Sequence, residues 1–435
     1  MGFYVLPSGH RGPWGQSGFH PKDCFLSTSS TRSTTPAARV QDSGFDCRIQ
    51  DNLRFVRESD VPVCLPHPGD FVVPITKHHA GRPIARALLA WFRANARDLP
   101  WRRNRTPYTA WLAEIMLQQT RVEQGTPYFE RFVAAFPAVQ DLAAAAEDEV
   151  LKQWEGLGYY SRARNLHRAA RIIVEEYGGC FPRTASGWMG LPGIGRYTAG
   201  AIASMAFGER TPVLDGNVIR VLARVFDISD CVDDTKTRKD LWAIAESLVP
   251  EKDPGSFNEA IMELGAQICR PRQPRCGECP LRRLCRAHAE GRPESRPVRR
   301  PAKTVPHRDM VAAVIRRNGN VLIARRPPKG LLGGLWEFPG GEIQNGESHA
   351  DALRRLLSAH FGISVSVGRA VMRTDHAYSH FRVTLHSYGC RILRGAPAPD
   401  FHTEFQWVAP AQLQTFAFPK VQHPLAESVV AQKRD

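Results

Sequence analysis

The sequence lacks any long uncharged hydrophobic segment. No apolar run approaches the ~20 residues that a membrane-spanning helix needs, so we expect no such helix in this chain of 435 residues. Acidic residues are also comparatively scarce: 43 Asp and Glu face 58 Lys and Arg, which leaves a formal net charge of +15. A positive excess of this size favours a polyanionic partner, with nucleic acid first and an anionic membrane surface second.

Cysteine is scarce as well. Ten cysteines in 435 residues are too few and too dispersed for a disulfide scaffold, which is short and cysteine-dense. Six of them stand singly, as free thiols in a reducing compartment do, and we expect a cytoplasmic location, or a nuclear or mitochondrial one in a eukaryote. The other four stand together, at Cys269, Cys276, Cys279 and Cys285.

The composition changes along the chain and divides it into four parts. Residues 1–80 hold Ser-Thr-rich stretches without a sustained helical period, and we interpret them as a disordered extension. Residues 81–290 repeat apolar side chains at helical spacing and predict an all-α domain. Residues 291–306 are a Pro- and Arg-rich linker. Residues 307–435 contain strand-like segments and one helical segment, which predicts an α+β domain.

Individual elements can be placed within the two domains. The expected helices of the first domain include roughly 147–154, 160–177, 196–207, 216–226, 237–249 and 256–268. The second domain should have a helix at 348–360 and strands at Met310–Ile315, Val321–Ala324, Phe381–Tyr388 and Phe405–Val408.

The clustered cysteines follow the spacing C-x6-C-x2-C-x5-C, so that four thiolates could surround one metal centre. A structural zinc site is one interpretation, although zinc ribbons usually pair two C-x2-C knuckles and only one is present. Two disulfides are another. The arginines Arg270, Arg272 and Arg275 between the first two cysteines form either a solvated basic loop or a set of phosphate contacts.

A glycine-rich turn precedes the helix expected at 196–207. Residues 191–199 read LPGIGRYTA, and Gly193 and Gly195 permit a tight turn next to Arg196. The backbone N–H groups at the start of the helix then stay uncovered, which suits a phosphate and reads no base. An ordinary helix–helix turn is the alternative.

Two carboxylates are candidates for chemistry. Glu114 lies about 60° from Trp111 on a helical wheel, at the edge of an apolar face. Partial burial there would raise its pKa and let it hold a proton, whereas a solvated ion pair is the alternative. Asp215 follows the glycine turn and directly precedes a helical segment, so it is either a helix N-cap or a catalytic carboxylate.

Taken together, the turn, Asp215 and the cysteine spacing resemble the iron–sulfur DNA glycosylases of the endonuclease III and MutY group. The resemblance implies that residues 191–199 form the turn of a helix-hairpin-helix motif, so that the first domain is an all-α helix-hairpin-helix glycosylase domain. The stretches WLAEIMLQQT (111–120) and LGYYSRAR (157–164) resemble the MutY family, over about residues 83–410. The resemblance implies a [4Fe–4S] cluster on the four cysteines and a catalytic role for Asp215. It also implies a monofunctional glycosylase, because Tyr197 stands where bifunctional relatives carry a Schiff-base lysine.

The resemblance further implies a substrate, which is adenine mispaired with 8-oxoguanine or guanine in double-stranded DNA. Glu114 would protonate adenine N7, and the Asp215 carboxylate would stabilise the positively charged sugar. We expect a monomer. The remaining implied site residues are supporting groups at Tyr197 and Asn217, pocket residues at Arg97, Trp101, Arg102 and Glu259, and DNA contacts at Gln119, Thr120, Leu157, Tyr159, Gly193, Gly195, Arg196, Arg270 and Arg272.

The C-terminal part supports the resemblance independently. Gly341, Glu347 and Arg355 fit the opening of the Nudix signature, but a later pair of metal-binding glutamates is replaced by Ala359 and His360. We therefore expect a Nudix-like fold without pyrophosphatase activity. Adenine glycosylases carry such a domain to recognise 8-oxoguanine.

Within that domain, the recognition element of the MutY family matches Tyr378, Ser379 and His380.

Three rival functions remain: an endonuclease III-type glycosylase/lyase for damaged pyrimidines, a nucleotide pyrophosphatase with a DNA-binding appendage, and a non-catalytic iron–sulfur DNA sensor. Tyr197 in place of Lys argues against the first, the missing glutamates against the second, and the presence of both Glu114 and Asp215 against the third.

Overall fold

The computed structural model describes residues 81–301, 304–378 and 381–432. The interpretation of residues 1–80 therefore lies outside the described residues, as do the predicted contacts of Ser379 and His380. None of the helices in the described ranges combines the length and the apolar character needed to cross a membrane.

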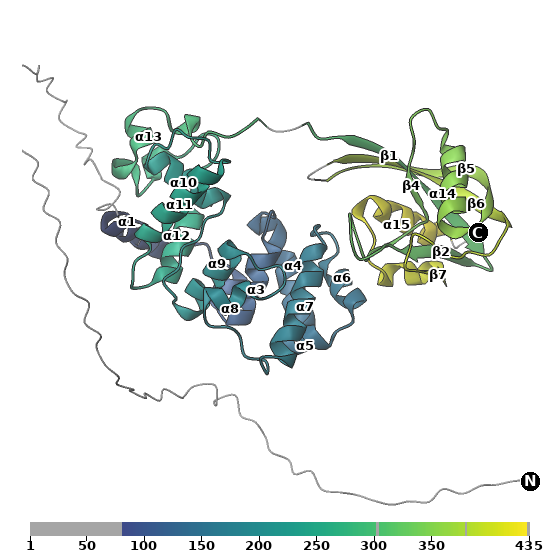
Figure 1. Cartoon of the computed structure of the whole chain (residues 1–435), viewed down its shortest axis with the longest axis horizontal. Helices are drawn as coiled ribbons and strands as arrows, with labels where there is room; N and C mark the ends of the chain where they lie inside the picture. The colour runs from purple at the N-terminus through teal and green to yellow at the C-terminus, as the bar shows by residue number, and fades with distance from the viewer. Residues whose placement is uncertain (1–80, 302–303, 379–380, 433–435) are drawn as a thin grey trace, which may run out of the picture. The chain divides into compact units, whose positions relative to one another are not determined.

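The first domain is entirely helical, as its hydrophobic periodicity predicts (Figure 1). The expected helices at 147–154, 196–207 and 256–268 are confirmed within two residues at each end. Its α-helices are α1 Gly81–Asn95, α2 Pro100–Arg103, α3 Pro107–Met116, α4 Val122–Ala135, α5 Val139–Ala144, α6 Glu147–Trp154, α7 Ser161–Glu175, α8 Ala185–Met189, α9 Arg196–Phe207, α10 Gly216–Val225, α11 Thr235–Leu248, α12 Pro254–Gln267 and α13 Arg286–Ala289.

Two apolar clusters form the core of this domain, and α9 belongs to both. One cluster gathers α3 to α8 around Trp111 and Trp154, and α9 contributes Ile202 to it. The other joins α1, α10, α11 and α12, and α9 contributes Ala201 to it. The start of α9 is thereby fixed between the two halves of the domain, which is where the candidate site lies.

The linker is held against the helical domain by ion pairs. Arg292 and Arg296 both contact Asp227, with N···O distances of 2.6 and 2.9 Å. Further along, Arg299 and Arg300 pair with Asp233 and Asp234, and the backbone N–H of Val232 donates to the carbonyl of Val298. Much of the linker's positive charge is therefore already neutralised within the protein.

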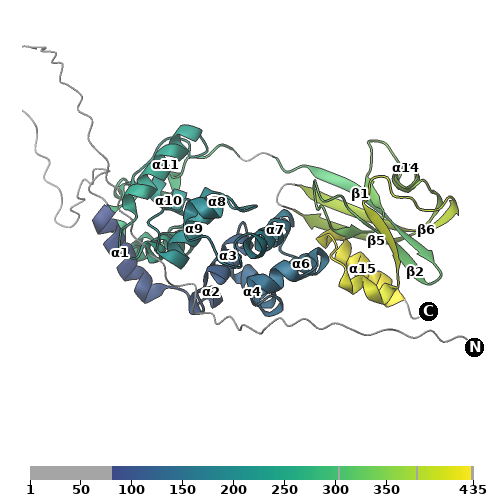
Figure 2. The same ribbon diagram turned by 60° about the horizontal axis from the view of Figure 1, so that its bottom comes forward.

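The C-terminal domain is a mixed sheet covered by helices on both faces (Figures 1 and 2). The strand order is β3-β2-β1-β6-β5, with β4 paired to β1 and β7 to β2; β1 runs parallel to β6 and antiparallel to β2 and β4. The elements are β1 His307–Arg317, β2 Asn320–Arg325, β3 Trp336–Glu337, β4 Gly340–Glu342, α14 His349–Phe361, β5 Ser364–Ala377, β6 Arg382–Arg394, β7 Glu404–Val408 and α15 His423–Ala431.

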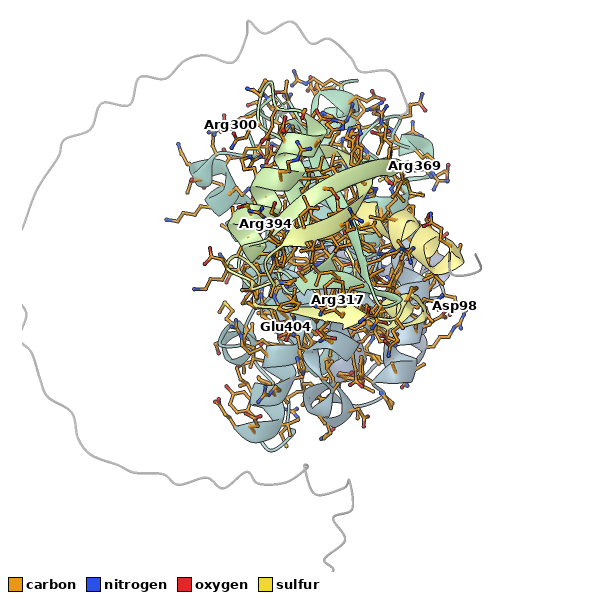
Figure 3. All side chains as sticks on the ribbon, turned by 90° about the vertical axis from the view of Figure 1, so that its right-hand side faces the viewer. Asp98, Arg300, Arg317, Arg369, Arg394 and Glu404 are labelled. Atoms are coloured by element: carbon orange, nitrogen blue, oxygen red, sulfur yellow. The ribbon has the colours of Figure 1, made fainter. Side chains whose placement is uncertain are left out.

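Alternation along β1 determines which helix covers which face. Val311 and Ala313 point into the cluster with α14, whereas Ala312 and Val314 point into the cluster with α15. Exposed arginines lie on the outside of the same sheet, including Arg369 of β5 (Figure 3). The sequence predicted β1, β2, β6, β7 and α14 but missed β3, β4, β5 and α15.

The close pairing of β4 with β1 can be tested by substitution at Gly340. A Cβ added to Gly340 would lie 2.0 Å from the carbonyl oxygen of Val311. We expect Gly340→Ala to lower the free energy of unfolding by about 1–3 kcal/mol, measured by urea denaturation of the full chain. Gly389→Ala in β6 is the control, since the nearest atom there lies 3.9 Å away. Equal stability of the two variants would contradict the pairing.

Candidate active site

One cavity of about 470 Å³ collects residues that are far apart in the sequence. It is lined by side chains of α2, α3, α9, α10 and α12. The sequence-predicted residues that it brings together are Arg97, Trp101, Arg102, Glu114, Gln119, Thr120, Tyr197, Asp215, Asn217 and Glu259.

Glu114 and Tyr197 form the centre of the cavity. The Tyr197 hydroxyl donates to Oε2 of Glu114 at 2.8 Å and also lies 3.2 Å from Sδ of Met262. Burial raises the pKa of Glu114 to about 7, and the nearby Asp215 charge adds to this effect, while the bond from Tyr197 opposes it. Glu114 can therefore hold a proton near neutral pH, as its position on the helical wheel predicted.

Asp215 combines both roles that the sequence left open. It is the N-cap of α10, because its Oδ1 accepts from the backbone N–H of Val218 at 2.7 Å. Its other oxygen accepts from Nδ2 of Asn217 at 2.8 Å, and the residue lines the cavity. Burial raises the pKa of Asp215, and these hydrogen bonds act in the opposite direction.

A chain of hydrogen bonds, which no sequence motif indicated, leads from Asp215 to the cysteine loop. Oδ1 of Asn217 accepts from Arg220 at 2.7 Å, and Nε of Arg220 donates to the carbonyl of Cys269 at 2.6 Å. The first cysteine of the cluster motif and the candidate carboxylate are therefore joined through two side chains.

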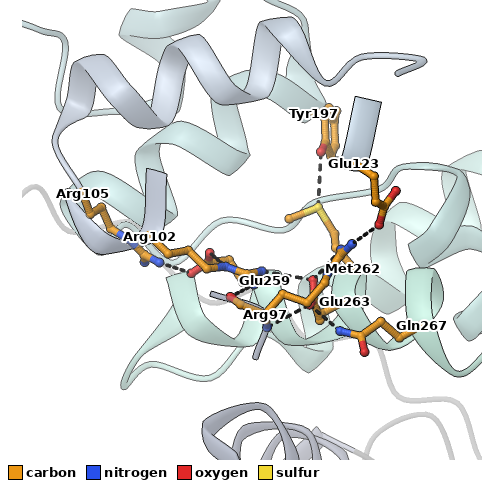
Figure 4. Close-up of polar contacts among 9 residues, drawn as sticks. All are labelled: Arg97, Arg102, Arg105, Glu123, Tyr197, Glu259, Met262, Glu263 and Gln267. Carbon is orange, nitrogen blue, oxygen red and sulfur yellow. Dashed lines mark hydrogen bonds and ion pairs between the residues drawn. The ribbon is translucent and has the colours of Figure 1, made fainter. Parts of the chain in front are cut away.

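Two further buried carboxylates lie one helical turn apart on α12 (Figure 4). Glu259 is held by Arg102 and Arg105, and Glu263 by Arg97 and Arg102. Although burial opposes it, bonding to the arginines lowers the pKa of Glu263 to about 2. Sequence reasoning missed Arg105 and Glu263; the four-residue spacing of two acids within an apolar helix was the available signal.

Figure 4 also shows Arg97 reaching a second acid, Glu123 of α4, with an N···O distance of 3.1 Å. Because the arginines are engaged with carboxylates on α12 and α4, they form a rigid wall of the cavity. Trp101 packs edge-to-face on Phe129, with ring centroids 5.2 Å apart, and closes the same wall.

The glycine turn presents the start of α9 to the outside. Gly193 has a φ of +77°, and a Cβ there would lie 2.8 Å from Cβ of Asn165. Gly195 is the N-cap of α9, and no atom of the protein lies within 4 Å of where its Cβ would be. Arg196 is exposed and stacks on Trp242, its guanidinium carbon 4.0 Å from the ring centre.

Most of the predicted DNA contacts outside the glycine turn lie around a second cavity. A second cavity of about 470 Å³ is lined by residues that include Gln119, Thr120, Leu157, Tyr159 and Tyr378. Two of these have left-handed backbones although they are not glycine: Gln119 with φ +58° and Tyr159 with φ +48°. Arg270 and Arg272 are exposed on the cysteine loop, away from both cavities.

The four clustered cysteines are free thiols that line one small cavity with apolar neighbours such as Val221 and Leu264. Burial raises the pKa of Cys279 to about 12 and of Cys285 to about 11, so a cation is needed to make them thiolates. In the described part of the chain no three ligand-type side chains already converge on a metal position. The chemistry of the donor set nevertheless fits a thiolate-held metal centre, and Arg224 donates to Sγ of Cys269 at 3.2 Å.

Comparisons with known proteins agree with this geometry. Residues 112–247 match the family model "HhH-GPD superfamily base excision DNA repair protein", and residues 310–428 match the NUDIX domain. The chain is 36% identical to the adenine DNA glycosylase of Homo sapiens over 79% of this chain and 74% of that protein. It is 39% identical to that of Buchnera aphidicola over 68% and 83%. The chain belongs to the adenine DNA glycosylase family.

As a member of that family, the protein is a DNA glycosylase of base excision repair, and DNA is its partner. Its first domain is similar to a thermostable thymine-DNA glycosylase (30% identity, TM-score 0.45, 48% of this chain and 99% of that one). It is also similar to an endonuclease III–DNA complex (24% identity, TM-score 0.43, 50% and 98%). The family assignment confirms the resemblance to adenine DNA glycosylases that the sequence motifs indicated.

The raised pKa of Glu114 predicts a pH dependence of stability. Between pH 4.5 and about 7 the unfolded state releases this proton before the folded state does, so the folded state loses stability as the pH rises through that window. We expect Glu114→Gln to be more stable than wild type at pH 8 by up to roughly 3 kcal/mol, with the difference vanishing near pH 4. Urea denaturation at both pH values measures it. Glu130→Gln, at an exposed site on α4, is the control, and an identical pH profile for all three proteins would contradict the burial.

Proposed function

We propose that this protein removes adenine mispaired with 8-oxoguanine or guanine in double-stranded DNA, by hydrolysing the N-glycosidic bond of the adenosine. The observation that carries the proposal is the pairing of two carboxyl groups in one cavity, Glu114 with its pKa near 7 and Asp215 with two hydrogen-bond donors. The relatives that the chain resembles over most of its length are named adenine DNA glycosylases.

Each carboxyl has a separate task in the reaction. Adenine leaves the base stack to enter the cavity, at a cost of a few kcal/mol. Protonated Glu114 donates its proton to adenine N7, which makes the base a neutral leaving group. The bond between N9 and C1′ breaks, and the sugar gains positive charge, which the Asp215 carboxylate stabilises. Water then adds to C1′ and loses a proton, which leaves an apurinic site in the DNA. Asn217 holds that carboxylate in place, and Tyr197 orients Glu114.

The absence of an amine at the position of Tyr197 supports hydrolysis without a lyase step. Tyr197 lies in the first turn of α9, directly after the glycine turn, and its hydroxyl donates a hydrogen bond to Glu114. A Schiff base needs a lysine amine there. We therefore infer a monofunctional enzyme.

The turn before α9 and the cysteine loop are the parts best suited to the DNA backbone. The space around Gly195 is free of protein atoms, which lets a phosphate approach the N–H groups at the helix start. Arg270 and Arg272 are exposed and can add charge-assisted contacts. Thr120, Leu157 and Tyr378 would contact the 8-oxoguanine, and Gln119 and Tyr159 would fill the gap that the extruded adenine leaves. All five line the second cavity. The enzyme would act as a monomer.

Cys269, Cys276, Cys279 and Cys285 would hold a [4Fe–4S] cluster, as endonuclease III-like folds commonly do. A bound cluster would link the four cysteines and so hold in place the loop that carries Arg270 and Arg272. The thiols are free, they face one cavity, and their apolar surroundings protect a cluster from water.

Duplexes that differ only in the mispair test the proposed function. Adenine should be released opposite 8-oxoguanine and opposite guanine, and a duplex carrying thymine glycol should stay intact. Release of thymine glycol without release of adenine would favour the endonuclease III-type alternative.

Asp215→Asn should slow adenine excision by roughly 100- to 1,000-fold while mispair binding is kept, because the amide has the size but not the charge of the carboxylate. Single-turnover rates and equilibrium binding measure the two effects. Asp234→Asn is the control for the change of charge, since Asp234 precedes α11 without a capping hydrogen bond and lies outside the cavity. A near-normal rate for Asp215→Asn would reduce this residue to a helix cap.

The cluster predicts about four irons per chain and a broad absorbance near ~400 nm in the purified protein. Iron and zinc analysis together with the absorbance spectrum measure both. Stoichiometric zinc without iron would refute the cluster and leave the proposed glycosylase chemistry untouched, because the cavity does not include the cysteines.

A further inference from the structure

One arginine of α7 joins two segments that lie about forty residues apart in the sequence. Nη1 of Arg162 donates to the carbonyls of Ile115, Met116 and Gln118 at 2.8, 3.0 and 2.7 Å. Its Nη2 donates to the carbonyls of Leu157 and Gly158, each at 3.2 Å. A single guanidinium thus donates to five backbone oxygens.

In each set, the last carbonyl belongs to the residue just before one with a left-handed backbone conformation. Gln118 is followed by Gln119, with φ +58°, and Gly158 by Tyr159, with φ +48°. Such backbones cost of order 1 kcal/mol or more for a non-glycine residue and persist where the surroundings fix them. The fork of Arg162 fixes the peptide before each of them, and Nε1 of Trp154 adds a second donor to the Gly158 carbonyl at 3.0 Å.

The charge of Arg162 is compensated by dipoles rather than by an acid. Among the described residues no carboxylate forms an ion pair with it. Two of its acceptors are the carbonyls of Ile115 and Met116, the last two residues of α3, at the negative end of the helix dipole. The rings of Trp154 and Tyr159 also lie 5.2 and 5.5 Å from its guanidinium carbon. A lysine could not replace this arrangement, because one ammonium cannot span both sets of carbonyls.

The first clamped segment lines both cavities, and the second, residues 157–159, lines the second cavity. Gln118, Gln119 and Thr120 line the cavity of Glu114, and Gln119 and Thr120 line the second cavity as well. Nε2 of Gln118 donates to Oγ1 of Thr198 at 3.1 Å, next to Tyr197 on α9. A shift of the 157–159 segment would therefore be transmitted through Arg162 to the wall of the first cavity.

We propose that Arg162 is a positioning residue that couples the two base-contacting segments, 117–120 and 157–159, so that they meet the mispair as one preformed surface. The inference rests on the proposed DNA contacts of Gln119 and Tyr159. It adds that these contacts are interdependent and that the interdependence is carried by a residue that contacts no base.

A double-mutant cycle tests the coupling. The dissociation constant is measured for a duplex with 8-oxoguanine opposite 2′-fluoro-2′-deoxyadenosine, a poor substrate, for wild type, Gln119→Ala, Tyr159→Ala and the double variant. In the wild-type background, we expect the loss in the double variant to differ at least threefold from the product of the two single losses. With Arg162→Lys in all four proteins, that factor should fall to about one.

Arg168→Lys is the matched control, because Arg168 is an exposed arginine on the same helix. It should leave the coupling factor unchanged, whereas a merely structural loss would lower stability without removing the coupling selectively. Thermal unfolding of each protein checks that it is folded. If Arg162→Lys does not fold, Arg162→Gln takes its place in all four proteins, because an amide cannot span both sets of carbonyls either; independent effects in the wild-type background would overturn the proposal in any case.

The cycle also separates this inference from the proposed function. If neither Gln119→Ala nor Tyr159→Ala weakens binding, the assigned DNA contacts are wrong, and the inference fails with them. If each weakens binding but their effects multiply, the contacts stand and the coupling through Arg162 is refuted. A coupling factor that persists with Arg162→Lys would likewise refute it, because the two side chains would then interact without the clamp.

Discussion

The site depends on one carboxyl group that can hold a proton near neutral pH inside a helical domain. Glu114 lies on α3 and lines the cavity, and in the described part of the chain it is bonded to the hydroxyl of Tyr197. This contact requires the first turn of α9 to lie next to α3. The packing of α9 in both apolar clusters fixes that position. The packing of two half-domains on one helix therefore determines where the proton is held.

The same cavity shows how environment separates carboxyl groups of similar burial. Glu263 is gripped by two guanidinium groups and has its pKa lowered to about 2. Glu114, which forms no ion pair among the described residues, has a pKa of about 7. The arginines of the wall pair with the acids of α12 and form no ion pair with Glu114 among the described residues, so burial dominates there and raises the pKa of Glu114. Acid and base assignments at pH 7 commonly arise from such contrasts.

Much of this arrangement could be predicted from single residues and their spacing, because periodicity and caps are local. The helical segments at 147–154 and 196–207 and the N-cap at Asp215 belong to this class. Strand β5 was missed because its half-exposed side chains follow no clean alternation. Arg162 and Glu263 were missed because their partners are backbone carbonyls and distant arginines, which only the folded chain brings within reach.

The ion pairs along the linker change how the net charge of +15 should be counted. Four linker arginines form ion pairs with aspartates of the helical domain, and Asp227 pairs with two of them. These arginines are Arg292, Arg296, Arg299 and Arg300. Paired cations release fewer counterions than free ones when a nucleic acid binds, so the linker adds less to the dependence of DNA binding on ionic strength than its four arginines suggest. The same ion pairs attach the linker to the helical domain through Asp227, Asp233 and Asp234.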